Sequence, residues 1–177
     1  TIITVGVPLE EMEDRLRTRL TDPRLCMVHQ LQRYRVPVLP NMGTPESELL
    51  SRISFDNFDV RGNYTDAQGR ESLEAALQDS RDFARDPEGW LVLTGVNGCG
   101  KTHLAVAIYS QRAKEGQGGY FFFVPDLLDH FRFTFSPESR VTYSELFEQV
   151  RNAPLLILDD LGSQSSTSWA QEKLYQI

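Results

Sequence analysis

The stretch GVNGCGKT at residues 95–102 decides the fold of this chain. It fits the phosphate-binding pattern G-x-x-x-x-G-K-[ST] at every defined position. In such a loop the backbone N–H groups surround a phosphate, the lysine reaches the outer phosphates and the final hydroxyl binds Mg²⁺. The residues expected to contact the nucleotide are Gly95, Val96, Asn97, Gly98, Cys99, Gly100, Lys101 and Thr102.

The two flanks of this loop are the ones that the motif requires. Residues 90–93, Trp-Leu-Val-Leu, form a short apolar run that is typical of a buried parallel strand. Residues 102–114 are apolar on most sides and predict a helix whose N-terminus faces the same anion. Strand, loop and helix in this order indicate a nucleoside triphosphate site rather than an accidental glycine-rich turn.

Composition narrows the class of protein. The chain has 177 residues, 40% of them hydrophobic and 24% charged, as expected of a globular domain with a modest appendage. A net charge of −7 argues against a broadly basic nucleic-acid surface and leaves room only for a local basic stripe. Two cysteines make no disulfide framework, and neither a membrane span nor a signal peptide is visible, so we expect a cytoplasmic protein.

The N-terminal residues predict a helical arm. Leu9, Met12, Leu16 and Leu20 recur at helical spacing among charged residues, and residues 8–35 read as an amphipathic hairpin or kinked helix. Such helices either pack on their own domain or bind a partner, and the sequence favours neither. Residues 37–50 carry three prolines and read as a linker, so we divide the chain into an arm with linker, 1–50, and a nucleotide domain, 51–177.

The nucleotide domain contains two further strand patterns and several helix patterns. The strands are expected at residues 120–124 and 155–158, and the helices at 69–86, from 126 to about 131, from 142 to 150 and from Trp169 onward. Thr142 with Glu145, and Ser168 with Gln171, fit capping boxes for the last two helices.

Two carboxylates follow the third strand of the nucleotide domain. In Leu-Leu-Ile-Leu-Asp-Asp, residues 155–160, Asp159 is placed to hold Mg²⁺ opposite Thr102, and Asp160 to polarise an attacking water. Ligands of open α/β sheets bind at this edge of the sheet. The alternative for Asp160 is a capping role in the following turn; the paired acids favour catalysis, with Lys101 as the second catalytic residue.

Here the sequence resembles a known family, the AAA+ ATPases of the DnaC/DnaI helicase-loader group and the related IstB transposition helpers. The resemblance covers residues 51–177. It rests on the loop running into Thr-His-Leu-Ala at 102–105, on Leu-Leu-Ile-Leu-Asp-Asp-Leu-Gly at 155–162, on Phe-Asp-Asn-Phe at 55–58 and on the helix at 169–177. It adds His103 to the residues expected near the nucleotide.

The resemblance implies an α/β three-layer P-loop domain with a central parallel sheet, ATP and Mg²⁺ as cofactors, and side-by-side assembly of copies. It implies a loader that places a hexameric replicative helicase on single-stranded DNA, held by an N-terminal arm, or alternatively a helper of a transposase. Within residues 126–151, the DNA contacts that it implies are Arg132, Arg140 and Arg151, although ordinary solvated arginines fit these positions equally well.

The family pattern also implies something that we do not find after the third strand. Its strand order, 5-1-4-3-2, places a fourth strand with a polar sensor between the first and third strands, and an arginine reaching into the neighbour's site follows. Both come after the third strand, and the sequence stops at Ile177. We therefore expect the C-terminal part of the domain to be missing, the sheet to be interrupted and the 177 residues alone to be poorly folded and inactive as an ATPase.

Three rival classes remain open. Asp-Asp-Leu-Gly at 159–162 also satisfies the D-x-x-G pattern of GTPases, although no guanine-reading N-K-x-D is found. A small-molecule P-loop kinase would not need Asp160 and would want an arginine-rich lid. A non-hydrolysing, nucleotide-gated adaptor is the third.

Overall fold

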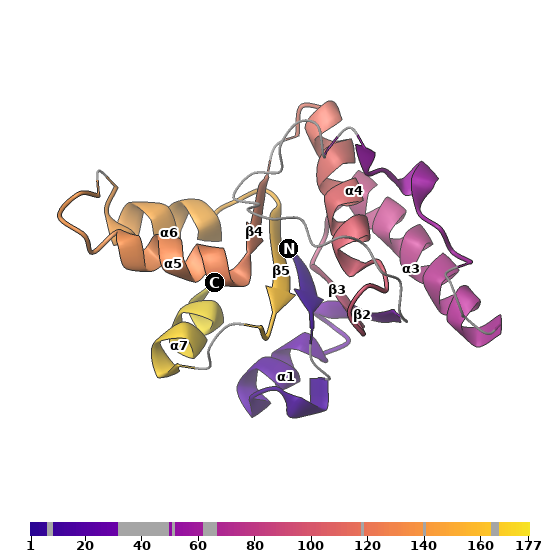
Figure 1. Cartoon of the computed structure of the whole chain (residues 1–177), viewed down its shortest axis with the longest axis horizontal. Coiled ribbons are helices and arrows are strands. Elements are labelled where there is room, and N and C mark those ends of the chain that lie inside the picture. The colour runs from indigo at the N-terminus through magenta and orange to yellow at the C-terminus, as the bar shows by residue number, and fades with distance from the viewer. Residues whose placement is uncertain are drawn as a thin grey trace.

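The computed structural model describes residues 1–6, 9–31, 50, 52–61, 67–117, 119–139, 141–163 and 167–177. Five parallel strands form one sheet in the order β2-β3-β1-β5-β4 (Figure 1). The strands are β1 Ile2–Val5, β2 Cys26–Leu31, β3 Trp90–Gly95, β4 Tyr120–Phe123 and β5 Leu156–Leu161. The predicted α/β class with a central parallel sheet is confirmed.

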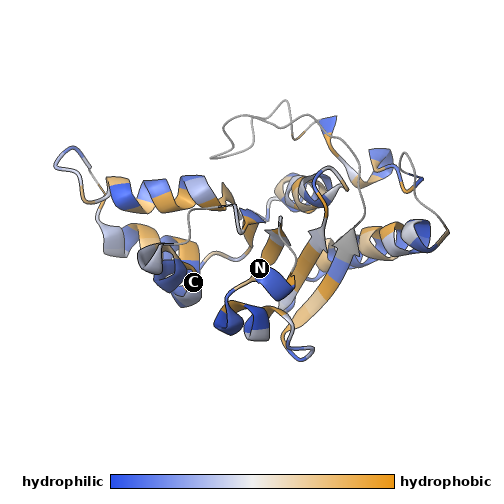
Figure 2. Cartoon of the chain, turned by 60° about the horizontal axis from the view of Figure 1, so that its bottom comes forward, coloured by the Kyte–Doolittle hydropathy of each residue, from blue (hydrophilic) through white to orange (hydrophobic). Residues whose placement is uncertain are grey.

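Helices cover both faces of the sheet. The helical elements are η1 Leu9–Glu11, α1 Asp14–Leu20, η2 Phe55–Asn57, α3 Ala67–Arg85, α4 Lys101–Lys114, α5 Val124–Phe133, α6 Tyr143–Arg151 and α7 Ser168–Gln176. One core lies between the sheet and α3, α4 and η2, and a second lies between the sheet and α1, α5, α6 and α7. The strands are mostly apolar, and the helices have one hydrophobic and one hydrophilic side (Figure 2), as a three-layer domain requires.

Strand β1 fills the place in the sheet that the sequence analysis left open. It lies between β3 and β5, and Ile2 pairs with Leu91 on one side and Ile157 on the other (Figure 1). Residues 1–5 are all β-branched, the composition that packs best on a pleated sheet, and Ile2 and Val5 are fully buried. The expectation of an interrupted sheet is therefore wrong. The positions of the fourth and fifth strands are occupied by β1 and β2, which precede the phosphate loop in the chain.

The prediction of a helical arm over residues 1–50 is wrong for most of the part that the structure describes. Residues 26–31, expected to be helical, form β2, which pairs with β3 along its whole length. The helical spacing in this stretch was outweighed by pairing with a neighbouring strand, which satisfies the backbone N–H and C=O groups. Strands β1 and β2 thus belong to the same sheet as β3, which leads into the phosphate loop. The predicted linker lies outside the described residues except for Leu50.

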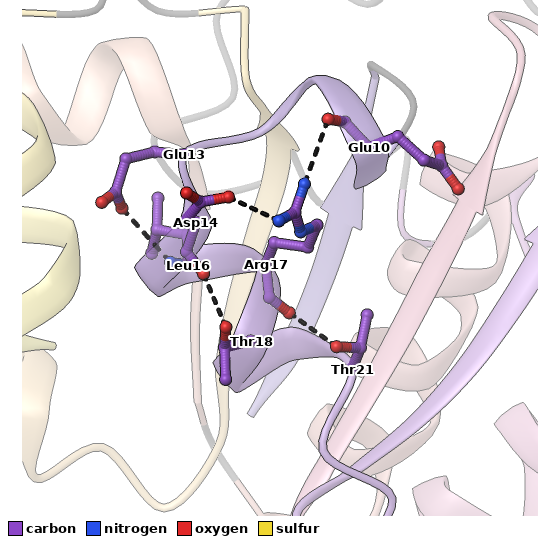
Figure 3. A network of polar contacts seen from close by, with 7 residues as sticks. All are labelled: Glu10, Glu13, Asp14, Leu16, Arg17, Thr18 and Thr21. Atoms are coloured by element: carbon purple, nitrogen blue, oxygen red, sulfur yellow. Dashed lines mark hydrogen bonds and ion pairs between the residues drawn. The ribbon is translucent and has the colours of Figure 1, made fainter.

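The helical prediction is right only for a short segment, α1, whose polar network is drawn in Figure 3. Glu13 accepts a hydrogen bond from the N–H of Leu16 at 3.3 Å and so caps the first turn. Arg17 pairs with Asp14 and reaches the carbonyl of Glu10 at 3.4 Å. The helix ends at Leu20, whose buried side chain joins the second core.

The remaining predictions within 51–177 are largely confirmed. The strand and helix patterns match β3, β4, β5, α3, α5, α6 and α7 to within a few residues, and the capping box of Thr142 and Glu145 is present. One cap differs, because Thr167 rather than Ser168 is the N-cap of α7, and its hydroxyl accepts a hydrogen bond from the N–H of Ala170 at 3.2 Å. Among the described residues, none of the helices has the length and apolar character needed to cross a bilayer.

Candidate nucleotide site

The phosphate loop joins β3 to α4 in the predicted order. Helix α4 has 14 residues, and no side chain caps its N-terminus, which begins after Gly100. The first N–H groups of an uncapped helix, together with the positive end of its dipole, form an anion site. The loop can therefore present several backbone donors to one phosphate group.

Two features require glycine at position 100: its backbone conformation and the close approach of Phe58. Its φ of 102° lies in the left-handed region that side chains disfavour. A Cβ atom added to it would also lie 2.6 Å from Cε2 of Phe58, so the Phe58 ring covers the end of the loop. Phe55 is buried in the first core and Phe58 packs against it.

Lys101 is buried, with 8% of its surface exposed, and it turns back onto the loop. Its Nζ donates to the carbonyls of Gly95 at 2.8 Å and Val96 at 3.1 Å. Its charge thus lies inside the loop that would surround a phosphate. An anion in the loop could exchange these carbonyl contacts for charge-assisted bonds to phosphate oxygens, which are stronger.

Two residues close to Lys101 in the sequence, Cys99 and His103, lie in different environments. The Cys99 thiol is buried, and burial raises its pKa from the ordinary value. The His103 ring contacts the stretch before the loop: its Nε2 lies 2.9 Å from the carbonyl oxygen of Ser54, and it packs in a T-shaped arrangement with the Phe58 ring, with ring centroids 5.2 Å apart. Burial lowers the pKa of His103, which favours a neutral ring donating from Nε2. A nucleotide-binding role for His103 stays a prediction.

Thr102 and Asp159 come together although they are 57 positions apart. Thr102 Oγ1 donates to Asp159 Oδ2 at 2.7 Å, and the Asp159 side chain is buried at the end of β5. Burial raises the pKa of Asp159, and hydrogen bonds from Thr4 and Thr102 act in the opposite direction. These are the two residues that the sequence analysis selected as ligands of one ion.

The chemistry of this donor set fits Mg²⁺. A hydroxyl and a carboxylate are hard oxygen donors, and Mg²⁺ is typically held by one or two carboxylates together with substrate phosphates. Over the part of the chain that the structure describes, no cluster of three or more His, Cys, Asp or Glu side chains could hold a metal ion without such a substrate. The ion would therefore be held jointly by Thr102, Asp159 and a bound nucleotide.

Asp160 adopts a conformation that is unusual for a residue with a side chain. Its φ is 59°, and among described non-glycine residues it alone has a positive φ. The register of β1 against β5 shifts here, since Ile3 faces Leu158 while Val5 faces Leu161, so β5 carries one extra residue. Such a bulge re-aims side chains. Asp160 lies within β5, and not beyond its end as predicted.

The sequence analysis missed two contributors to this site, Thr4 and Gly6 of the N-terminal stretch. Thr4 contacts Asp159 and Asp160, and a Cβ atom on Gly6 would lie 3.0 Å from Asp160 Oδ1. The β-branched run at residues 1–5 was the available signal for a strand here. Its pairing with strands far along the chain was not readable from that run.

Two of the three arginines suggested as DNA contacts are engaged with other side chains. Arg132 pairs with Asp129 at 2.6 Å and its guanidinium lies 5.0 Å from the Trp169 ring centre. Arg151 pairs with Glu148 at 3.0 Å. Arg140 lies outside the described residues. DNA contact by these residues stays a prediction.

Comparison with known proteins places the site in a family context. A family model described as IstB-like ATP-binding protein matches residues 41–177. The replicative helicase loader DnaC of Buchnera aphidicola (subsp. Acyrthosiphon pisum) is 29% identical over 130 residues, which cover 73% of this chain and 51% of the relative. The DnaC of Escherichia coli K12 is 26% identical over 132 residues, covering 73% and 50%.

A second kind of loader is also similar over a shorter stretch. The replicative helicase loader DnaI of Bacillus subtilis is 30% identical over 84 residues, covering 48% of this chain and 26% of the relative. The chain spans about half the length of the DnaC relatives it matches. No solved structure matched.

Proposed function

Because the chain belongs to the family of IstB-like ATP-binding proteins within the AAA+ group, we propose that it is an ATP hydrolase that acts in DNA replication as a loader of the replicative helicase. The observation that carries the nucleotide part is the joined geometry of the phosphate loop, the uncapped α4 and the Thr102–Asp159 bond. Together they provide phosphate donors and metal ligands at one edge of the sheet.

In this proposal each residue has one task. The loop N–H groups and Lys101 hold the phosphates, and Lys101 follows the developing negative charge during transfer. Thr102 and Asp159 would hold Mg²⁺, and the ion would supply positive charge beside the phosphate oxygens. Asp160 accepts a hydrogen bond from the attacking water and fixes its direction, as a carboxylate next to the metal ligand can do.

Loading of a helicase is proposed on the names of the relatives, which are replicative helicase loaders. The partner would be a hexameric replicative helicase, with single-stranded DNA as a further ligand and assembly of several copies when ATP binds. Residues 1–31 are not proposed as the helicase-binding arm, since their strands are part of the sheet. The paired Arg132 and Arg151 carry no part of this proposal.

A second function is favoured by one observation, the family model itself, whose description is IstB-like. It is an ATP-dependent helper of a transposase. The same nucleotide site would serve either role, so the difference lies in the partner.

The nucleotide proposal is tested by calorimetry with ATP and GTP, followed by hydrolysis assays with and without single-stranded DNA. We expect Mg²⁺-dependent binding of ATP and slow turnover. Preference for GTP would instead support a GTPase, and binding without turnover under every condition would support a nucleotide-gated adaptor. The partner is tested by sedimentation of the chain with the purified helicase or the purified transposase encoded in the same genome, in ATP and in ADP.

A further inference from the structure

The bulge in β5 brings two neighbouring acids to one place. In a regular strand successive side chains point to opposite faces of the sheet, so Asp159 and Asp160 would be separated. The extra residue in β5 and the φ of 59° at Asp160 change this, because the chain turns between the two acids. An aspartate whose backbone is in the left-handed region costs free energy within a strand, so contacts with surrounding residues must stabilise this conformation.

The Thr4 side chain provides that contact from the neighbouring strand β1. Its hydroxyl donates to Asp159 Oδ1 and accepts the N–H of Asp160 at 2.8 Å. One hydroxyl can do both, since it has one donor and two acceptor sites. Thr4 is fully buried, so water does not substitute for it. The amide that the bulge removes from regular strand pairing is thus shared between Thr4 Oγ1, at 2.8 Å, and Asp159 Oδ1, at 3.0 Å, and Thr4 is the partner that comes from another strand.

Gly6, which directly follows β1, leaves room for the second acid. A Cβ atom on Gly6 would lie 3.0 Å from Asp160 Oδ1 and 4.0 Å from Asn97 Oδ1. The Asp160 carboxylate therefore lies near the end of β1 and on the side of the phosphate loop that carries Asn97. Thr4 fixes the backbone of the acid pair, and Gly6 gives the Asp160 side chain space beside the loop.

We propose that Thr4 is a positioning residue of the nucleotide site, which holds the β5 bulge so that Asp159 faces Thr102 while Asp160 faces the phosphate loop. This inference rests on the proposed ATPase function. The N-terminal strand thereby belongs to the active site as well as to the sheet. Thr4 lies outside residues 41–177, which the family model matches.

The experiment compares Thr4→Val, which keeps the shape and removes the hydroxyl, with Thr4→Ser, which keeps the hydroxyl. In the full 177-residue chain we expect Thr4→Val to lower kcat by about 10–100-fold, the range seen when a group that orients a metal ligand is removed. KM for ATP and binding of ATP without Mg²⁺ should change little, because Thr4 does not touch the loop. Thr4→Ser should restore most of kcat.

A control variant separates positioning from loss of stability. Ser110→Ala also removes a buried hydroxyl, one that donates to the carbonyl of Leu50 at 2.8 Å, on the far part of α4. It should lower the melting temperature and leave kcat at the parental value. Unchanged kcat in Thr4→Val, or equal losses in Thr4→Val and Thr4→Ser, would overturn the role of Thr4.

Failure of the positioning role of Thr4 can be distinguished from failure of the proposed ATPase function. If the parent chain binds ATP without hydrolysing it, the ATPase proposal fails, and Thr4 is then judged by the gain in ATP affinity on adding Mg²⁺. That gain should be lost in Thr4→Val and kept in Thr4→Ser. If the parent binds no nucleotide, a crystal structure of Thr4→Val decides: Asp160 leaving the left-handed region supports the role, and Asp160 keeping it overturns the role.

Discussion

Thr102 Oγ1 donates a hydrogen bond of 2.7 Å to Asp159 Oδ2, which links the first turn of α4 to the C-terminal half of β5. The two residues come from different strand–helix units of the sheet. Their contact sets the distance between the phosphate loop and the acid pair before any ligand arrives. Such preorganisation removes part of the cost of assembling a metal site on nucleotide binding.

Lys101→Ala should weaken ATP binding while leaving the fold intact. Loss of a charge-assisted contact to phosphate costs about 1.5–3 kcal/mol, or roughly 10–150-fold in affinity. Calorimetry measures the change, and Lys114→Ala, at the exposed end of the same helix, is the matched control. Equal ATP affinity in parent and Lys101→Ala would remove the phosphate-loop assignment.

Replacing Asp159 and replacing Asp160 should affect different steps, one the binding of ATP with Mg²⁺ and the other the turnover. Asp160→Asn is expected to bind ATP like the parent and to lose turnover, since the amide does not activate water. Asp159→Asn is expected to lose the Mg²⁺-dependent part of ATP binding, because its carboxylate faces Thr102. Titrating ATP with and without Mg²⁺, alongside turnover, measures both. Parental turnover in both variants would show that the acid pair is structural.

Strand β1 should be necessary for folding. Ile2→Ala removes a fully buried side chain between β3 and β5 and should lower the free energy of unfolding by about 2–5 kcal/mol. Val141→Ala, at a position that is 44% exposed, should change it by less than about 0.5 kcal/mol. Urea unfolding followed by circular dichroism checks both values. A small effect at Ile2 would contradict the central position of β1.

Cys99 should be unreactive in the folded chain. Burial raises the pKa of its thiol, so at any pH below that value less of it is thiolate, the reactive form. Alkylation by iodoacetamide, followed by mass spectrometry from pH 7 to pH 9, should be far slower than in the urea-unfolded chain. Rapid labelling of the native chain at pH 7 would show that the loop opens readily.

Local patterns predicted most of the α/β layout after residue 51. The apolar run before Gly95, the run after Gly119 and the run before Asp159 had the length and composition of buried strands. The capping box at Thr142 marked a helix start. These signals lie within a few residues of the elements that they specify, so one sequence is enough to read them.

What could not be read depended on distant pairing. Residues 1–5 have strand composition, but only their contacts with β3 and β5 place them at the centre of the sheet. Cys26–Leu31 had helical spacing and became a strand because β3 offered an unpaired edge. The bulge at Asp160 has no local signature either, since it arises from the register between β1 and β5.

The central place of β1 also has a consequence for the order of synthesis. Thr4 leaves the ribosome 155 residues before its partner Asp159. At about 5–20 residues per second, the N-terminal strand must wait on the order of ten seconds before both neighbours exist. During that time β1 can pair with β3 but lacks β5, its other flanking strand, and the contacts that close the sheet are among the most non-local in the chain. Slow folding and a need for chaperone protection of the nascent chain follow from this connectivity.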